Sequence, residues 1–230
     1  MRPRRLSMPS VGALGALALG VASAAAVTTV GAAGPAGGGC QLQGQASLNP
    51  GLNSSSQPFT YSFSGDLSSC QSNVAGAPAS GTVSAGKVVA ENVTVTTAGG
   101  PVPATFNYQE PVPSGTGGCT SSTTAGEAFV VWADATQTAV GYTTTGALAA
   151  VALQGTADPS VVLQPVPGQG ITVAGVFYPA PTYTFTTTRY AGDAALGTLA
   201  FQPADPTACN TPAGVTQAAI SGTVNLGHAS

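Results

Sequence analysis

Apolar and polar residues alternate with a period of two along most of the chain, which is typical of half-buried β-strands. In the segment 59–65 the aromatic residues share one face, and Thr and Ser side chains share the other. The segment 182–190 alternates in the same way and places Tyr183, Phe185 and Arg189 on one face. Both segments are therefore predicted to be strands with one buried face.

Further strands are predicted from the same alternation and from enrichment in Val and Thr. They are expected at 41–48, 81–89, 92–97, 104–108, 127–133, 136–142, 147–155, 194–201 and 218–226. Asp134 and Ala135 would form the turn of a hairpin. No segment after residue 35 shows a 3.6-residue apolar stripe with helix caps. The fold class is therefore predicted to be all-β, an antiparallel β-sandwich or jelly roll, built as one unit or as two related β units.

Clusters of Pro and Gly interrupt this alternation at 99–103, 111–115 and 158–181. Proline cannot donate a hydrogen bond to a neighbouring strand, so these segments are predicted to be loops or edge strands. If the chain forms two sub-units, 40–110 and 119–230, the linker between them lies near 111–118 and begins with the second cluster.

The first residues of the chain have the pattern of a secretory signal peptide. Arg2, Arg4 and Arg5 form a positively charged start, which the apolar stretch 11–21 and the small residues 22–26 follow. This pattern predicts a signal peptide at the N-terminus and a secreted, extracellular protein.

Cleavage is expected after Ala24 or Ala26, where small residues fit the peptidase. The chain then divides into a signal peptide at 1–26, a flexible segment rich in Gly and Ala at 27–39, and a β-sandwich domain at 40–230. An uncleaved segment would instead anchor the protein in a membrane, but Ala and Gly make it poorly hydrophobic for that role.

Charged residues are scarce, at 6% of the chain against about 25% in an average soluble domain. Nucleic-acid binding is excluded, because 5 Lys and Arg residues are too few to form a basic patch. A disordered polar chain is excluded as well, because 43% of the residues are hydrophobic. After cleavage at Ala26 only Lys87 and Arg189 remain as bases beside all eight acids, which gives a formal charge of −6.

Four cysteines, Cys40, Cys70, Cys119 and Cys209, form an even set in an exported chain, which predicts two disulfides. They lack the close pairs that zinc sites need, so no metal site is predicted. Four cysteines allow three pairings.

A weak internal repeat favours one of these pairings. The segment 63–70 is followed by the sequence Ser-Gly-Thr-Val at 80–83, and the segment 201–209 is followed by the same sequence at 221–224. If these are two copies of one unit, Cys40 pairs with Cys70 and Cys119 with Cys209. Chance similarity in a chain rich in Gly, Ser and Thr is the alternative.

Catalytic groups are few. The only histidine, His228, is third from the C-terminus, and no glycine-rich phosphate loop followed by Lys is present. No catalytic residue and no cofactor is therefore predicted, and the protein is not expected to be an enzyme. The one pair worth testing is Glu127 and Asp134, because two carboxylates suffice for glycoside hydrolysis and Trp132 lies between them in the sequence.

Three residues are weak candidates for ligand contacts: Arg189, Tyr183 and Trp132. Arg189 is the only arginine after the signal peptide and shares its strand face with Tyr183, so it could face a ligand among aromatic rings. A structural ion pair that closes the end of the core is the favoured interpretation. The Trp132 ring could stack on a sugar, although a core position is the simpler expectation.

The segment that begins at Cys40 and continues through Gly44, Ala46, Leu48 and Pro50-Gly51-Leu52 is followed by 59–65, by Cys70-Gln-Ser72 and by Gly81-Thr-Val83. This stretch, about residues 40–90, resembles a group of small secreted actinobacterial proteins of unknown function. The resemblance implies export, a Cys40–Cys70 bridge and a β-rich fold, and it implies no activity. In composition the chain is also similar to the apoproteins of enediyne chromoproteins, but the cysteine spacing differs.

These observations predict a secreted, non-catalytic β-sandwich protein that acts in binding or assembly at the cell surface or outside the cell. Cell-wall glycan, a second copy of the chain and a small apolar ligand are the candidate partners. The first alternative is a small-molecule carrier with a pocket between the sheets, and the second is a carboxylate-based polysaccharide hydrolase.

Overall fold

A computed structural model describes residues 37–147 and 149–227 of the chain. The predicted signal peptide, with its cleavage site, and His228 lie outside the described residues. So does the predicted flexible segment at 27–39, except for residues 37–39, which belong to the first strand. The described residues belong to one compact unit.

The described residues form strands, short connections and one 3-10 helix, which confirms the all-β prediction. The strands are β1 (Gly37–Leu52), β2 (Gln57–Ser72), β3 (Gly81–Ala85), β4 (Val88–Thr97), β5 (Gly100–Gln109), β6 (Ser114–Gly117), β7 (Ser121–Trp132), β8 (Gln137–Ala147), β9 (Ala150–Asp158), β10 (Ser160–Pro165), β11 (Gly170–Val173), β12 (Val176–Pro179), β13 (Tyr183–Thr186), β14 (Ala194–Pro203) and β15 (Val215–Gly227). The 3-10 helix η1 spans Pro206–Asn210. Within this part of the chain no helix is long and apolar enough to cross a membrane.

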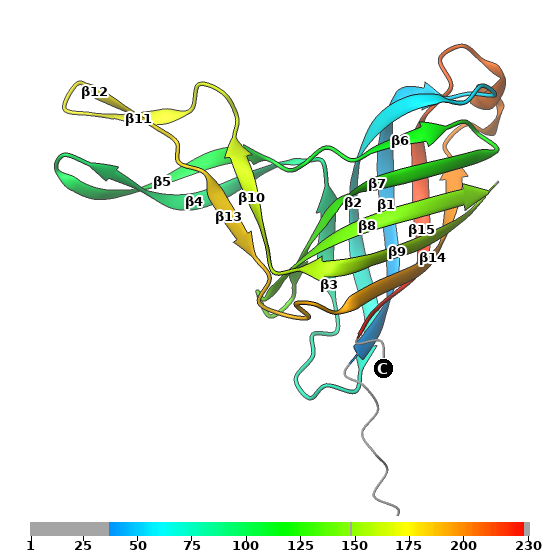
Figure 1. The fold of residues 1–230 in the computed structure, drawn as a ribbon, viewed down its shortest axis with the longest axis horizontal. Helices are drawn as coiled ribbons and strands as arrows, with labels where there is room; N and C mark the ends of the chain where they lie inside the picture. The colour runs from blue at the N-terminus through cyan, green and yellow to red at the C-terminus, as the bar shows by residue number, and fades with distance from the viewer. Residues whose placement is uncertain (1–36, 148, 228–230) are drawn as a thin grey trace, which may run out of the picture. The chain divides into compact units, whose positions relative to one another are not determined.

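The largest sheet closes on itself, which corrects the prediction of a sandwich or jelly roll (Figure 1). β1 pairs with β2 on one side and with β15 on the other, so eight strand positions form a ring. The ring order is β1, β2, β3, β7, β8, β9, β14 and β15, each antiparallel to its neighbours. Strands therefore follow one another around the barrel in the order of the chain.

The stagger of the paired strands sets the width of this barrel. Following paired residues once around the ring leads from Gly39 on β1 back to Asn49 on β1, an offset of ten residues. With about 3.3 Å per residue and about 4.8 Å between strands, this offset gives a strand tilt of about 40° and a radius of about 8 Å. The filled barrels of TIM-type folds have an offset of about eight. A ten-residue offset therefore leaves a wider interior.

One strand position of the ring is split between β3 and β6. Both pair with β2 and β7 and run in the same direction, β3 opposite 63–67 of β2 and β6 opposite 57–60. The chain leaves the barrel after β3 at Gly86, whose φ of +67° favours glycine, and returns through Pro113. The strand predicted at 81–89 is thus broken, and the β4–β5 hairpin is an insertion into the barrel wall.

A second insertion lies between β9 and β14 and contains β10 to β13. β13, β10, β5 and β4 form a second sheet, and its side chains pack with Phe129 and Ala139 of the barrel wall into a separate apolar core. At the centre of this core the Phe129 and Phe185 rings meet edge to face. Each residue of β10 pairs on one side only, as expected for a proline-rich segment.

Both disulfides have the pairing that the internal repeat favoured. Cys40–Cys70 joins β1 to β2 at a bulge, where the register shifts between Gly39 and Gln41. Cys119–Cys209 joins the β6–β7 connection to η1, with 90 residues between the two cysteines. Two bridges are consistent with an oxidising environment outside the cytoplasm. The two copies of the internal repeat contribute strands to the same closed sheet and do not form separate units.

Candidate functional site: an apolar cavity inside the barrel

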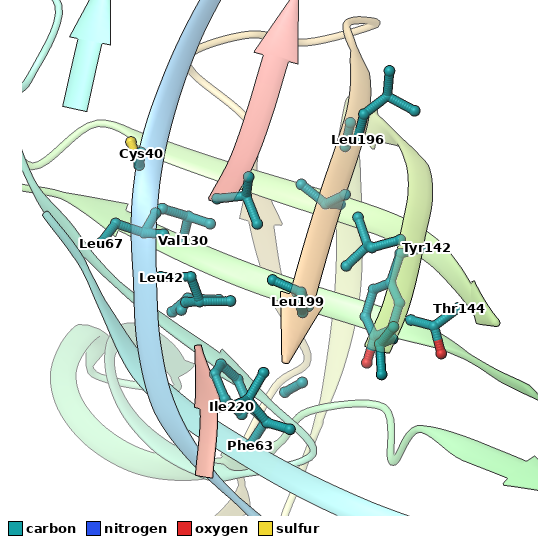
Figure 2. Close-up of a pocket in the computed structure, with 18 of the residues that line it drawn as sticks. Cys40, Leu42, Phe63, Leu67, Val130, Tyr142, Thr144, Leu196, Leu199 and Ile220 are labelled. Atoms are coloured by element: carbon teal, nitrogen blue, oxygen red, sulfur yellow. The ribbon is translucent and has the colours of Figure 1, made fainter. Parts of the chain in front are cut away.

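The interior of the barrel contains a cavity of about 190 Å³. Side chains from all eight strand positions of the ring line it, and Figure 2 shows part of this lining. Most of them are apolar, among them Leu42, Leu67, Val130, Leu199 and Ile220. The period-two alternation explains this lining, because every second residue of each strand points into a closed barrel.

The inward apolar side chains are incompletely buried along one part of the wall. Ala128, Val151, Leu153 and Ile220 line the cavity but stay partly accessible to solvent. In a filled barrel such positions would be covered by side chains from the opposite strands. Their accessibility therefore indicates open space inside the barrel.

Two paired glycines make room for an aromatic ring in the wall. Gly44 and Gly65 are opposite each other on β1 and β2, and a Cβ atom on either would lie within 3 Å of the Phe63 ring. The ring of Phe63 lines the cavity at this place. The glycines thus keep Phe63 against the wall, and the cavity remains open.

Four hydroxyl groups form a connected chain on the cavity wall. The hydroxyl oxygens of Tyr142 and Tyr61 are 2.5 Å apart, and Tyr61 is 3.2 Å from the Thr124 hydroxyl. The Thr124 hydroxyl in turn is 2.7 Å from that of Thr144, its partner on the next strand. All four residues line the cavity. We call them the hydroxyl chain.

Burial keeps the two phenols of this chain neutral. It raises the pKa of Tyr61, and it raises the pKa of Tyr142 further, with the neighbouring Tyr61 adding to the effect. Both side chains therefore carry their proton at any pH at which the protein works, and each can donate a hydrogen bond.

No charged side chain is found among the described residues that line the cavity. Glu110 lies behind the barrel wall and not in the cavity lining, but its charge contributes to the raised pKa of Tyr142. Glu110 is 1% exposed, and its carboxylate accepts hydrogen bonds from the Ser84 hydroxyl at 2.5 Å and from the Lys87 backbone N–H at 2.8 Å. It thereby ties the two ends of the β4–β5 insertion to β3.

We expect Glu110→Gln to remove one source of pH dependence from the stability of the protein. Burial raises the pKa of Glu110 in the folded state, despite the two donors that lower it. As pH rises, Glu110 loses its proton at a lower pH in the unfolded chain than in the folded protein. Its contribution to the free energy of unfolding therefore falls between the unfolded-state pKa and the folded-state pKa. Gln keeps both contacts, because its carbonyl accepts from Lys87 and its amide donates to Ser84.

Urea unfolding at pH 4 and pH 7 measures this effect. The variant should gain stability relative to the wild type between pH 4 and pH 7, and an equal difference at both values would contradict the interpretation. Glu110→Ala serves as the control for the contacts, because it leaves the Lys87 N–H without a partner and should cost about 1–3 kcal/mol.

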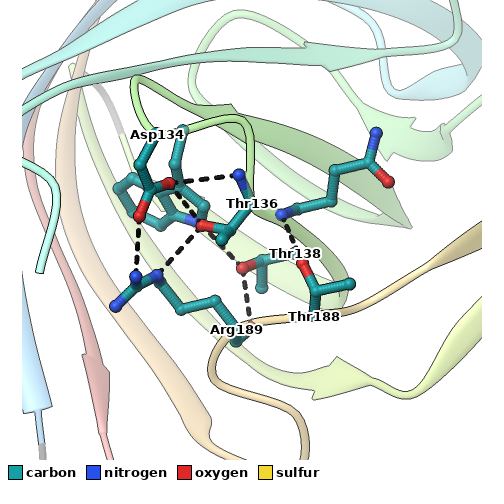
Figure 3. A network of polar contacts seen from close by, with 7 residues as sticks. Asp134, Thr136, Thr138, Thr188 and Arg189 are labelled. Carbon is teal, nitrogen blue, oxygen red and sulfur yellow. Dashed lines mark hydrogen bonds and ion pairs between the residues drawn. The ribbon is translucent and has the colours of Figure 1, made fainter.

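A polar network joins the β7–β8 turn and the start of β8 to the segment that follows β13 (Figure 3). The Trp132 indole N–H donates to the Thr138 hydroxyl at 2.8 Å, and Thr138 donates to the Arg189 carbonyl at 2.8 Å. The Arg189 guanidinium forms an ion pair with Asp134 at 2.7 Å and donates to the Thr136 hydroxyl at 3.0 Å. The hydrogen bond from Thr136, followed by the charge of Arg189, holds the pKa of Asp134 below its usual range.

The three ligand candidates from the sequence are thus placed in different surroundings. Trp132 lines the cavity and meets Tyr190 edge to face with ring centroids 5.7 Å apart. Arg189 is absent from the lining and is engaged in the ion pair with Asp134. Tyr183 packs against Tyr108 in the second core, outside the cavity.

The two carboxylates considered for hydrolysis are not brought together. Glu127 lies on the continuous strand β7, and Asp134 follows the end of that strand at Trp132. Five residues of extended strand place Glu127 about 17 Å from Trp132, and Asp134 lies beyond that end of the strand. The two carboxylates are therefore farther apart than the roughly 10 Å that a glycosidase pair allows. Burial, followed by the charge of Asp158, raises the pKa of Glu127. Among the described residues no three metal-ligating side chains form a group.

The hydroxyl chain was not predicted from the sequence, and the pocket that the carrier alternative expected between two sheets lies instead inside one closed sheet. The alternation of β7 does place Thr124 on the same face as Ala128 and Val130, and that of β8 places Thr144 beside Tyr142. The sequence therefore shows that these Thr side chains share a face with apolar residues. It does not show that this face points into a closed barrel.

Comparisons of the chain with protein families, with curated proteins and with solved structures give no match.

Proposed function

We propose that this protein binds a small, mainly apolar molecule in the cavity of its barrel and acts as an exported carrier or scavenger. The observation that supports this most is the apolar cavity, lined from all eight strand positions and partly accessible to solvent. Eight-stranded antiparallel barrels have interiors that either are filled by side chains or hold one small ligand. Here the ten-residue stagger and the glycine pair under Phe63 favour the second arrangement.

Export through the N-terminal signal peptide, with cleavage after Ala24 or Ala26, is part of this proposal. It is supported by the arginine-led apolar start of the sequence and by the two disulfides. A binding role without catalysis is favoured because the described residues that line the cavity offer hydrocarbon, hydroxyl and amide groups, and no acid, base or thiolate.

Native and denaturing mass spectrometry of the protein from its own culture medium tests the proposal. We expect the native mass to exceed the denatured mass by that of one small molecule. The denatured mass should lie below the reduced mass by four hydrogens, and its value gives the cleavage site. A native protein without added mass that also fails to bind toluene at millimolar concentration would overturn the proposal.

A further inference from the structure

We infer that the ligand is electrically neutral and carries one hydroxyl or carbonyl group on an otherwise apolar frame, and that this group binds the hydroxyl chain of Tyr61, Thr124, Tyr142 and Thr144. The inference rests on the proposed function and names the chemical class of its ligand. It follows from a count of hydrogen bonds, from the charges around the cavity and from the cavity's size.

The hydrogen-bond count leaves the hydroxyl chain incomplete. Four hydroxyl groups supply four protons, and the three hydrogen bonds that join them use three. One proton is therefore left to donate, on one of the four hydroxyls, and lone pairs remain free to accept. A ligand carbonyl can accept this proton, and a ligand hydroxyl can both accept and donate.

The buried position of the hydroxyl chain makes its unused proton and lone pairs unfavourable to leave without hydrogen-bond partners. Tyr142 is 8% exposed, and apolar side chains such as Val140 and Leu153 line the cavity beside it. An apolar molecule that filled the cavity would remove water from the hydroxyls without replacing its hydrogen bonds, and this would weaken its binding. A molecule with one matching polar group avoids this cost.

The charges around the cavity argue against an ionised ligand. The two cations of the described residues, Lys87 and Arg189, are absent from the lining, and Arg189 is paired with Asp134. A carboxylate ligand would thus be buried without a partner charge, which is strongly unfavourable. A cation would also lack a partner, because no carboxylate is among the described residues that line the cavity.

The volume limits the size of the apolar frame. A dry cavity of about 150 Å³ lined by Leu, Ile and Phe takes up benzene. The cavity of about 190 Å³ found here has a similar lining and therefore suits a frame of one or two rings. Methylbenzene derivatives are accordingly suitable probes.

Isothermal titration calorimetry with toluene, p-cresol and p-toluate at pH 7 tests the inference. The three share one frame and differ in carrying no polar group, a neutral hydroxyl or a carboxylate. The variant is the fourfold change Tyr61→Phe, Thr124→Val, Tyr142→Phe and Thr144→Val, which removes all members of the hydroxyl chain at nearly constant volume. Because no partner is left unpaired, this variant should fold. Tyr108→Phe is the matched control, since that phenol donates to the Pro181 carbonyl outside the cavity.

In the wild type p-toluate should bind at least tenfold more weakly than p-cresol. In the fourfold variant the preference for p-cresol over toluene should fall about tenfold, which corresponds to one hydrogen bond. Tyr108→Phe should leave this preference unchanged. An unchanged preference in the fourfold variant, or p-toluate binding equal to that of p-cresol, would overturn the inference and leave the proposed function standing. If the wild type binds none of the three probes and its native mass also shows no added small molecule, the proposed function itself is contradicted.

Discussion

Replacing Cys119 and Cys209 together by Ala should lower the free energy of unfolding by about 4–5 kcal/mol, because the bridge closes a loop of 90 residues. In the chain-entropy account the stabilisation grows with the length of the closed loop, since the crosslink removes more freedom from the unfolded chain. Small proteins have total stabilities of about 5–15 kcal/mol. Loss of this one bridge should therefore bring the protein close to unfolding at 37 °C.

The position of the bridge adds a structural reason. Cys119 and Cys209 pack beside a group of buried residues at one end of the barrel, which includes Leu48, Leu52 and Phe59. The Cys119 backbone N–H also donates to the Asn53 carbonyl at 2.8 Å. The bridge thus joins the β1–β2 connection, the β6–β7 connection and η1. Without it these three connections are held only by noncovalent contacts, among them the small apolar cluster and this backbone hydrogen bond.

The other disulfide supplies the control. Cys40 and Cys70 enclose a shorter loop, with a sequence separation of 30, and lie on adjacent paired strands. Replacing this pair by Ala should cost about 3.5 kcal/mol, roughly 1 kcal/mol less than the first pair. Urea unfolding of both double variants measures the two values. A larger loss from the Cys40–Cys70 pair would show that strand linkage outweighs loop length here.

The sequence predicted the class of the fold well, because strand periodicity is a local property. The strands at 59–65, 104–108 and 194–201 and the turn at Asp134–Ala135 are confirmed. The strand predicted at 147–155 was wrong in one respect, since it includes the connection between the ends of β8 and β9. Alternation continues through such a tight connection, so the pattern alone did not reveal it.

Closure of the barrel was beyond prediction because it depends on partners far apart in the sequence. Gly37 at the start of β1 pairs with Gly227 at the end of β15. Alternation tells which residues share a face, but it does not tell which strand lies next to which. The same pattern fits an open sandwich and a closed barrel. The prediction of a sandwich was wrong for this reason.

The candidate site could be predicted only in part for the same reason. Trp132 was identified from the sequence and does line the cavity, whereas Arg189 serves an ion pair, the favoured interpretation. Thr124 and Thr144 were not singled out, because a Thr in an alternating strand is normally expected on the solvent face. In a closed barrel with an open interior the inward face also accepts hydroxyl groups, provided that they bond to one another.

Filling the cavity from within should abolish ligand binding without unfolding the protein. Ala128 lies on β7, lines the cavity and is partly accessible. In Ala128→Phe the added ring should occupy the space that the ligand needs, so toluene affinity should fall at least tenfold. Because the ring gains contacts in a space that is now empty, the melting temperature should stay the same or rise.

The same strand provides the matched control. Ala125 faces away from the barrel interior and is exposed, so Ala125→Phe adds the same ring outside the cavity. Its toluene affinity should remain within about twofold of the wild type. If overpacking prevents Ala128→Phe from folding, Val151→Phe on β9 tests the same space, with the exposed Ala152→Phe as its control. A folded inward variant with wild-type toluene affinity would place the binding site outside the barrel, because two bulky groups cannot share a cavity of about 190 Å³.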